Sequence, residues 1–136
     1  MEAIKYFEQG YSCSESIIKE AVDLGLCDAS LLPVATSFSG GMGSGCLCGT
    51  IAGAQMVIGY IYGKNNSKGN EAIARQLAKE FIDKFKSQYK ATCCRVLTHG
   101  LDMHSPERKN NCKNLVEFSS KLLKEIPRIR EVNRNI

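Results

Sequence analysis

Residues 39–53 read SGGMGSGCLCGTIAG, a glycine-rich loop that leads through two cysteines into an apolar segment. Glycine accepts positive φ angles and lets the backbone approach other groups closely, so residues 39–45 favour a tight loop. From about Cys48 to Tyr62 apolar residues occupy almost every side of a helix, which predicts a buried central helix. A cysteine at this junction lies at a helix N-terminus, where the helix dipole and free N–H groups favour the thiolate.

The rest of the chain also predicts helices, because apolar residues recur at intervals of three and four and no long alternating strand pattern occurs. Gly45, Gly49 and Gly53 are four residues apart, so we expect one helix face that packs closely against another backbone or a cofactor. The fold class is therefore all-α, an irregular multi-helix bundle around a buried, glycine-rich central helix. The further helices are expected within residues 1–9, from the capping box at 12–15 to Gly25, within 28–38, over 70–89, from a Thr92 cap to Gly100, and from Ser105-Pro106 to Pro127.

The length of 136 residues suits one domain, and we expect a helical domain with a cysteine site over 1–126 and a basic C-terminal tail over 127–136. The net charge of +4 lacks an accompanying basic patch with aromatics, which argues against nucleic-acid binding. Residues 29–63 carry no charge, but glycines and polar residues interrupt them, so no membrane span is expected. No signal peptide is visible at the amino terminus, which favours a cytoplasmic protein.

Seven cysteines in a reducing compartment indicate metal or redox chemistry rather than a disulfide framework. Cys27, taken alone, is expected to be a packed core residue. Four others each stand at the expected beginning of a helix and on its apolar face, so their helix N-termini could converge on a pocket that stabilises anionic sulfur. These four are Cys13 after Ser12, Cys48 after the glycine loop, Cys94 after Thr92 and Cys112 after Asn111.

These residues resemble the C_GCAxxG_C_C family of redox-active proteins, whose name spells out its four-cysteine motif. The core motif resembles residues 48–53, with Thr50 in place of the usual alanine. Cys13, Cys94 and Cys112 resemble the other three cysteines, and Cys46 and Cys93 are extra neighbours that leave open which member of each pair acts. The resemblance implies a redox role, and it extends to a cysteine domain of split-Soret cytochromes with an iron–sulfur cluster, which favours a cluster here.

Three hypotheses follow for the cysteines. In the first, an iron–sulfur cluster serves electron transfer or redox sensing with a protein redox partner. Its metal ligands are Cys13, Cys48, Cys94 and Cys112, with Cys46 and Cys93 as substitutes. Gly49 and Gly53 lie beside the cofactor. In the second, no metal is bound, and Cys93 with Cys94, Cys46 with Cys48, or two cysteines from separate helices cycle between thiol and disulfide. Cys48 and Cys94 are then the catalytic residues, and a low-pKa thiolate at the Cys48 helix start is the attacking group. In the third, the thiolates bind zinc.

The remaining features are less specific. His99 and His104 lie in a polar loop and are expected to face solvent. The glycine loop lacks the lysine of a nucleotide-binding phosphate loop but could cradle an anion. The glycine face and apolar residues such as Tyr60 and Tyr62 leave a homodimer and a buried core as alternatives.

Overall fold

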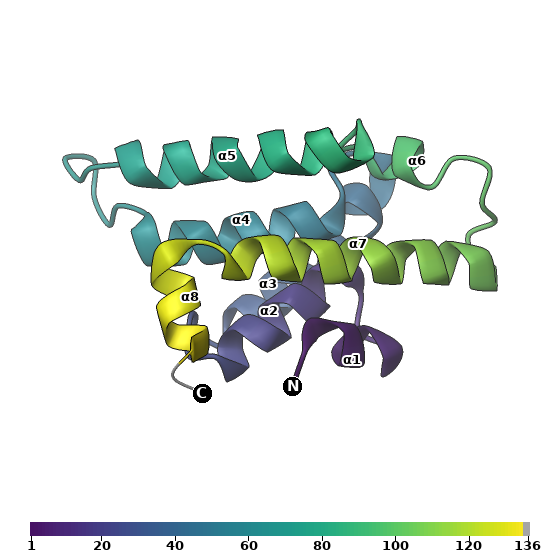
Figure 1. Ribbon diagram of the computed structural model, residues 1–136, viewed down its shortest axis with the longest axis horizontal. Coiled ribbons are helices and arrows are strands. Elements are labelled where there is room, and N and C mark those ends of the chain that lie inside the picture. Colours follow the sequence, from purple (N-terminus) through teal and green to yellow (C-terminus); the bar gives the residue numbers. More distant parts are fainter. Residues whose placement is uncertain (135–136) are drawn as a thin grey trace.

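The computed structural model describes the backbone of residues 1–134 and the side chains of residues 1–131. Of the described residues, 69% are helical and none lies in a strand, which confirms the predicted all-α, multi-helix fold (Figure 1). The elements are α1 (Ala3–Glu8), α2 (Cys13–Asp23), α3 (Leu31–Thr36), the turn η1 (Gly41–Gly45), α4 (Gly49–Tyr62), α5 (Ala72–Tyr89), α6 (Cys94–Leu97), α7 (Pro106–Lys124) and α8 (Pro127–Arg134).

Helix α4 occupies the centre, with α5 and α7 running beside it and α1, α2 and α3 on the other side (Figure 1). Its side chains Ile51, Val57 and Ile58 are fully or almost fully buried, as predicted for an apolar helix that meets neighbours on most sides. Its most extensive contact is with α2. A Cβ atom at Gly53 would stand 3.0 Å from the Ser14 carbonyl oxygen, so the glycine permits this close approach.

Local sequence signals set several helix ends. The predicted capping box is present at α2, where the Ser12 hydroxyl accepts from the Glu15 N–H and the Glu15 carboxylate accepts from the Ser12 N–H. At α7 the Ser105 hydroxyl accepts from the Arg108 N–H and Pro106 occupies the first position. The predicted α5 is also present.

Two local predictions are wrong. Gly45 lies in η1 rather than on the α4 face, because the backbone between Gly40 and Gly45 turns through left-handed φ angles before the helix begins. Thr92 does not cap α6; the cap position is Cys93, because residues 46–48 pair with this segment and the Thr92 carbonyl accepts from the Cys48 N–H.

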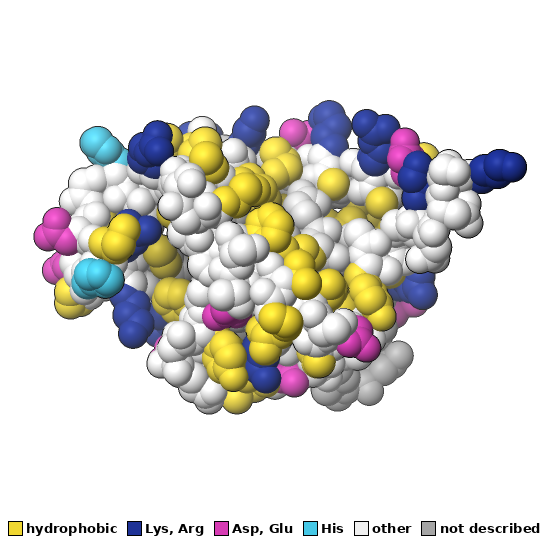
Figure 2. All heavy atoms as spheres, turned by 180° about the vertical axis from the view of Figure 1, so that it is seen from behind, with side chains coloured by type: hydrophobic (Ala, Val, Ile, Leu, Met, Phe, Trp, Pro, Cys, Tyr) yellow, Lys and Arg dark blue, Asp and Glu magenta, His cyan; other side chains and the backbone are white. Residues whose placement is uncertain are grey.

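Residues 127–134 form the last described helix, α8, and its Ile129 is buried in the main core. No helix in the described part of the chain is both long enough and apolar enough to cross a membrane. Apolar side chains gather across the middle of the face opposite the view of Figure 1 (Figure 2). Tyr60 is exposed and Tyr62 half-buried.

Candidate functional site

The segment before α4 lies against the segment before α6. Leu47 and Cys93 form an isolated antiparallel bridge. The Cys48 N–H donates to the Thr92 carbonyl at 2.8 Å, and the Cys94 N–H donates to the Cys46 carbonyl at 2.5 Å. This pairing, which we call the strap (residues 46–48 with 92–94), brings two parts of the sequence that are far apart together at the beginnings of α4 and α6.

The four cysteines of the expected site line one cavity of about 190 Å³, which we call the thiol cavity. Each comes from a different helix or helix cap: Cys13 is the first residue of α2, Cys48 caps α4, Cys94 is the first residue of α6 and Cys112 lies within α7. Apolar side chains complete much of the wall, among them Phe7, Leu97 and Leu115. The cavity therefore joins thiols from the whole length of the chain in an apolar setting.

Cys112 does not stand at a helix N-terminus, so the expected convergence of four helix beginnings is wrong. Helix α7 begins six residues earlier, at Pro106. The asparagines before Cys112 resemble caps in the sequence, but the Ser105 hydroxyl and the fixed φ of proline set the start of the helix instead. Cys112 faces the cavity from the interior of the helix, and at most three thiols have helix beginnings behind them.

The structure separates the members of each neighbouring cysteine pair. Cys48 and Cys94 are buried and line the thiol cavity, whereas Cys46 and Cys93 are exposed and are absent from its wall. Cys27 is buried in the main core, as expected. The exposed pair is therefore accessible to reagents in solution, and the buried pair faces the other two cavity thiols.

Burial raises the pKa of three of the cavity thiols, those of Cys13, Cys48 and Cys112. It raises the pKa of Cys13 to about 12, with a further rise from the Cys48 thiol beside it. Burial also raises the pKa of Cys48, against hydrogen bonds from Thr50 that lower it, and the pKa of Cys112, against the nearby Arg108 guanidinium. The low pKa expected for Cys48 at a helix start is therefore wrong, because desolvation outweighs the helix dipole and the hydrogen bonds.

Two glycines, Gly49 at the beginning of α4 and Gly41 in η1, make room for the site. A Cβ atom at Gly49 would overlap the Cys13 Sγ and stand 3.1 Å from the Phe38 carbonyl oxygen. At Gly41 a Cβ atom would stand 2.7 Å from the Cys94 Cβ. Gly53 lies one turn after Gly49 and contacts α2 rather than the cavity. Gly49 lines the cavity and Gly53 does not.

Two of the cavity sulfurs contact polar side chains, Arg108 and Thr50, for which the sequence predicted no role at the site. Arg108 donates from Nη2 to the Cys94 Sγ at 3.8 Å. Ser119 donates to the Thr50 Oγ1 at 2.9 Å, and this hydroxyl lies 3.2 Å from the Cys48 Sγ. The spacing of Arg108 four residues before Cys112 could have placed Arg108 beside the Cys112 thiol, but it gives no indication of the contact with Cys94.

His99 and His104 are exposed and absent from the thiol cavity, as expected for loop histidines. Within residues 1–131, no three His, Cys, Asp or Glu side chains stand close enough to share one metal ion. The four thiols line the cavity but do not converge on the position of a single metal ion.

The family model described as "Putative redox-active protein (C_GCAxxG_C_C)" matches residues 11–126 of the chain. This range contains all four cavity cysteines. No curated protein and no solved structure matches the chain.

Proposed function

Because this chain belongs to the C_GCAxxG_C_C family, described as redox-active, we propose that the four cavity thiols ligate an iron–sulfur cluster for electron transfer or redox sensing. The observation that carries this proposal is the thiol cavity itself. Cysteines from four separate helices or helix caps line one largely apolar space, which is an arrangement that four thiolate ligands of a cluster require.

The size of the thiol cavity favours a cluster over a single ion. Zinc holds each sulfur ligand at about 2.3 Å from one central point. The four thiols instead line a space of about 190 Å³. A group with several iron atoms offers separate coordination positions around its outside, and so it suits thiols that surround a cavity.

The electrostatics of the thiol cavity include one contribution that opposes metal binding and two that favour it. Metal binding requires the thiols to lose their protons, and a raised pKa makes free thiolates scarce at neutral pH. The Arg108 guanidinium beside Cys94 supplies a compensating positive charge. The N–H groups at the beginnings of α2 and α4 favour negative sulfur in the same space.

A bound cluster would supply one-electron transfer, and the residues around the thiols would adjust its reduction potential. The Thr50 hydroxyl is placed to donate to the Cys48 sulfur, and Ser119 fixes the orientation of that hydroxyl. Apolar wall residues such as Phe7 and Leu115 limit contact with water. The exposed Cys46 and Cys93 do not contribute to the cavity wall.

The test is an ultraviolet–visible spectrum with iron and acid-labile sulfide assays on protein purified without oxygen. Serine substitution of any one of the four cavity cysteines should remove or strongly reduce iron, sulfide and the charge-transfer bands. The matched controls are Cys27→Ser, Cys46→Ser and Cys93→Ser, which change a core cysteine and two exposed cysteines and should retain iron and sulfide. Full iron and sulfide in all four cavity variants would refute the cluster proposal.

Colourless, metal-free wild-type protein would also refute the cluster and favour thiol–disulfide chemistry. All four thiols line one cavity, so the disulfide of this alternative would be expected between two of them. Mild oxidation followed by peptide mapping would then identify the pair. A disulfide between two cavity cysteines would establish the alternative function.

A further inference from the structure

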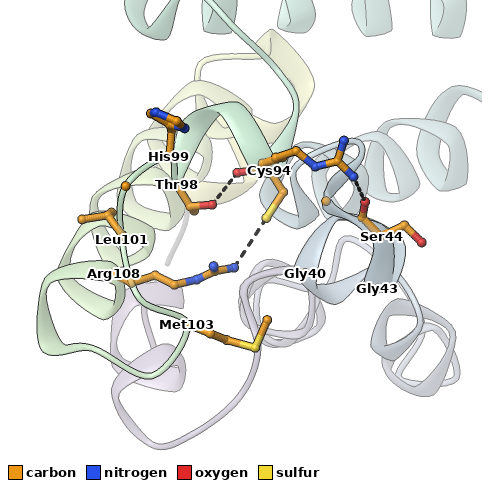
Figure 3. Close-up of a pocket in the computed structure, with 12 residues that line it drawn as sticks. Gly40, Gly43, Ser44, Cys94, Thr98, His99, Leu101, Met103 and Arg108 are labelled. Atoms are coloured by element: carbon orange, nitrogen blue, oxygen red, sulfur yellow. Dashed lines mark hydrogen bonds between the residues drawn. The ribbon is translucent and has the colours of Figure 1, made fainter.

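A second pocket lies on the outer side of Arg108, next to the thiol cavity. Its volume is about 590 Å³, a size typical of small-molecule sites. It lies between η1 and the segment that joins α6 to α7 (Figure 3). We call it the arginine pocket, and its lining includes Gly43, Ser44, Arg95, His99, Met103 and Arg108.

The arginine pocket and the thiol cavity share part of their walls. Gly40, Cys94, Thr98 and Arg108 line both spaces. Figure 3 shows Arg108 extending across the pocket towards the Cys94 sulfur, with Ser44 and the glycines of the turn on the far side. A ligand in the arginine pocket would therefore lie against Arg108, which also contacts the Cys94 sulfur of the thiol cavity.

The charge of this pocket is one-sided. Two guanidinium groups and one imidazole line it, and none of its lining residues is an aspartate or glutamate. Within the described side chains, neither Arg95 nor Arg108 forms a salt bridge. Figure 2 shows the histidines at one end of the molecule, where both basic and acidic side chains are present. The positive charge is therefore specific to the pocket lining, which would attract an anion.

Arg95 is held in place without being neutralised. Its Nη2 donates to the Ser44 carbonyl oxygen at 2.9 Å, and it lies against Gly45, where an added Cβ atom would stand 3.1 Å from the Arg95 Cβ. A guanidinium group has five N–H donors, so a single bond to a carbonyl leaves others for a ligand. Arginine binds carboxylate and phosphate groups through paired N–H donors.

We propose that the arginine pocket binds a small organic molecule through a carboxylate or phosphate group held by Arg95 and Arg108. Because Arg108 also contacts Cys94, a bound anion would draw this guanidinium away from the sulfur and couple ligand binding to the thiol cavity. The proposal does not depend on what the thiols hold, since every residue that it uses is present in the chain without a cofactor.

The experiment is isothermal titration calorimetry of the full chain as purified, with inorganic phosphate and succinate as separate probes at constant ionic strength. Saturable binding of at least one probe at one site per chain is expected. The preferred probe identifies the class of anionic group. No saturable binding of either probe to the wild-type protein would overturn the proposal.

Three arginine variants locate the site. Arg95→Gln should weaken binding of the preferred probe at least tenfold, whereas Arg95→Lys, which keeps the charge but loses the paired donors, should retain part of the affinity. Arg75→Gln is the matched control, because Arg75 is exposed on α5 and pairs with Glu71. Equal affinity in the wild-type protein, Arg95→Gln and Arg75→Gln would show only general attraction to positive charge and would refute the assignment.

Circular dichroism of each variant, with thermal melting, shows whether the fold is retained. Arg95 is exposed, so a native fold is expected in both of its variants. Iron and sulfide assays on the same samples separate the two proposals. Anion binding to iron-free protein would support the arginine pocket and refute the cluster. Iron-loaded protein that binds no anion would support the cluster and refute the arginine pocket.

Discussion

Replacing Gly49 with alanine should damage the thiol cavity while the rest of the fold remains. The new Cβ atom would overlap the Cys13 Sγ, whereas ordinary contacts between such atoms are about 3.5–4.0 Å. The Phe38 carbonyl oxygen, 3.1 Å from the same Cβ position, limits a shift of α4 to the other side. The Cys13 side chain must therefore turn out of the cavity, or the beginnings of α2 and α4 must separate.

The two responses have similar energetic consequences. Overpacking of a buried contact costs about 1–3 kcal/mol, and the gain from replacing glycine in a helix is at most about 1 kcal/mol. We expect a net loss of about 1 kcal/mol in the free energy of unfolding, or about 4 °C in Tm for a domain of this size. In either response the Cys13 sulfur leaves its position, so the variant should also lose most of its iron and sulfide.

Gly59→Ala is the matched control for this change. Gly59 is in the same helix, but no heavy atom lies within 4 Å of its added Cβ position. This variant should gain up to about 1 kcal/mol and keep its iron. Thermal and urea unfolding give the stabilities, and the iron and sulfide assays give the occupancy. If Gly49→Ala proves as stable and as iron-loaded as Gly59→Ala, the close contact between Gly49 and Cys13 does not exist in solution.

Three further predictions concern the cavity thiols. In metal-free protein the Cys13 thiol should lose its proton near pH 8.5 in the unfolded chain, but only near its pKa of about 12 in the folded chain. The free energy of unfolding should therefore fall as the pH rises from about 9 to about 12. Urea titrations should show a shallower fall in Cys13→Ser than in Cys46→Ser. Iodoacetamide at neutral pH should modify exposed Cys46 before buried Cys48, and peptide mass spectrometry showing Cys48 modified first would contradict the burial argument. Thr50→Val should remove the hydrogen bond to the Cys48 sulfur and so lower the reduction potential of a bound cluster. It should also destabilise the fold by about 1–3 kcal/mol, because the buried Ser119 hydroxyl loses its partner. An unchanged potential in electrochemical titration would show that this hydroxyl does not act on the cluster.

The helices could be predicted from the sequence because their signals are local. The capping box at Ser12 and the long apolar periodicity of α5 are set by residues within a few positions of each other. The buried central helix follows from its composition in the same way. Gly53 was expected to allow close packing, and it does so against α2.

The details of the candidate site depend on contacts between distant parts of the sequence, and these left no local signal. The strap pairs Leu47 with Cys93, so that Cys93 rather than Thr92 precedes the first turn of α6. Competing local signals also misled the prediction at Cys112, where two asparagines resemble a cap but Ser105 and Pro106 begin the helix earlier. The low pKa predicted for Cys48 is wrong for a third reason. The position of a residue at the start of a helix does not show how deeply its side chain is buried, and burial raises the pKa of this thiol.

The strap links the thiol cavity to the folding of the whole chain. Cys48 and Cys94 are brought together by the two backbone hydrogen bonds of the Leu47–Cys93 bridge, while Cys13 and Cys112 lie on helices that pack elsewhere. A group that binds all four thiols would therefore bind the folded chain far more tightly than the unfolded chain, and it would stabilise the fold by mass action. The largest effect should be at the strap, because the four-residue helix α6 packs chiefly against the short turn η1 rather than against a long helix. Loss of the bound group should then release the α6 region first, and with it the wall that the thiol cavity shares with the arginine pocket.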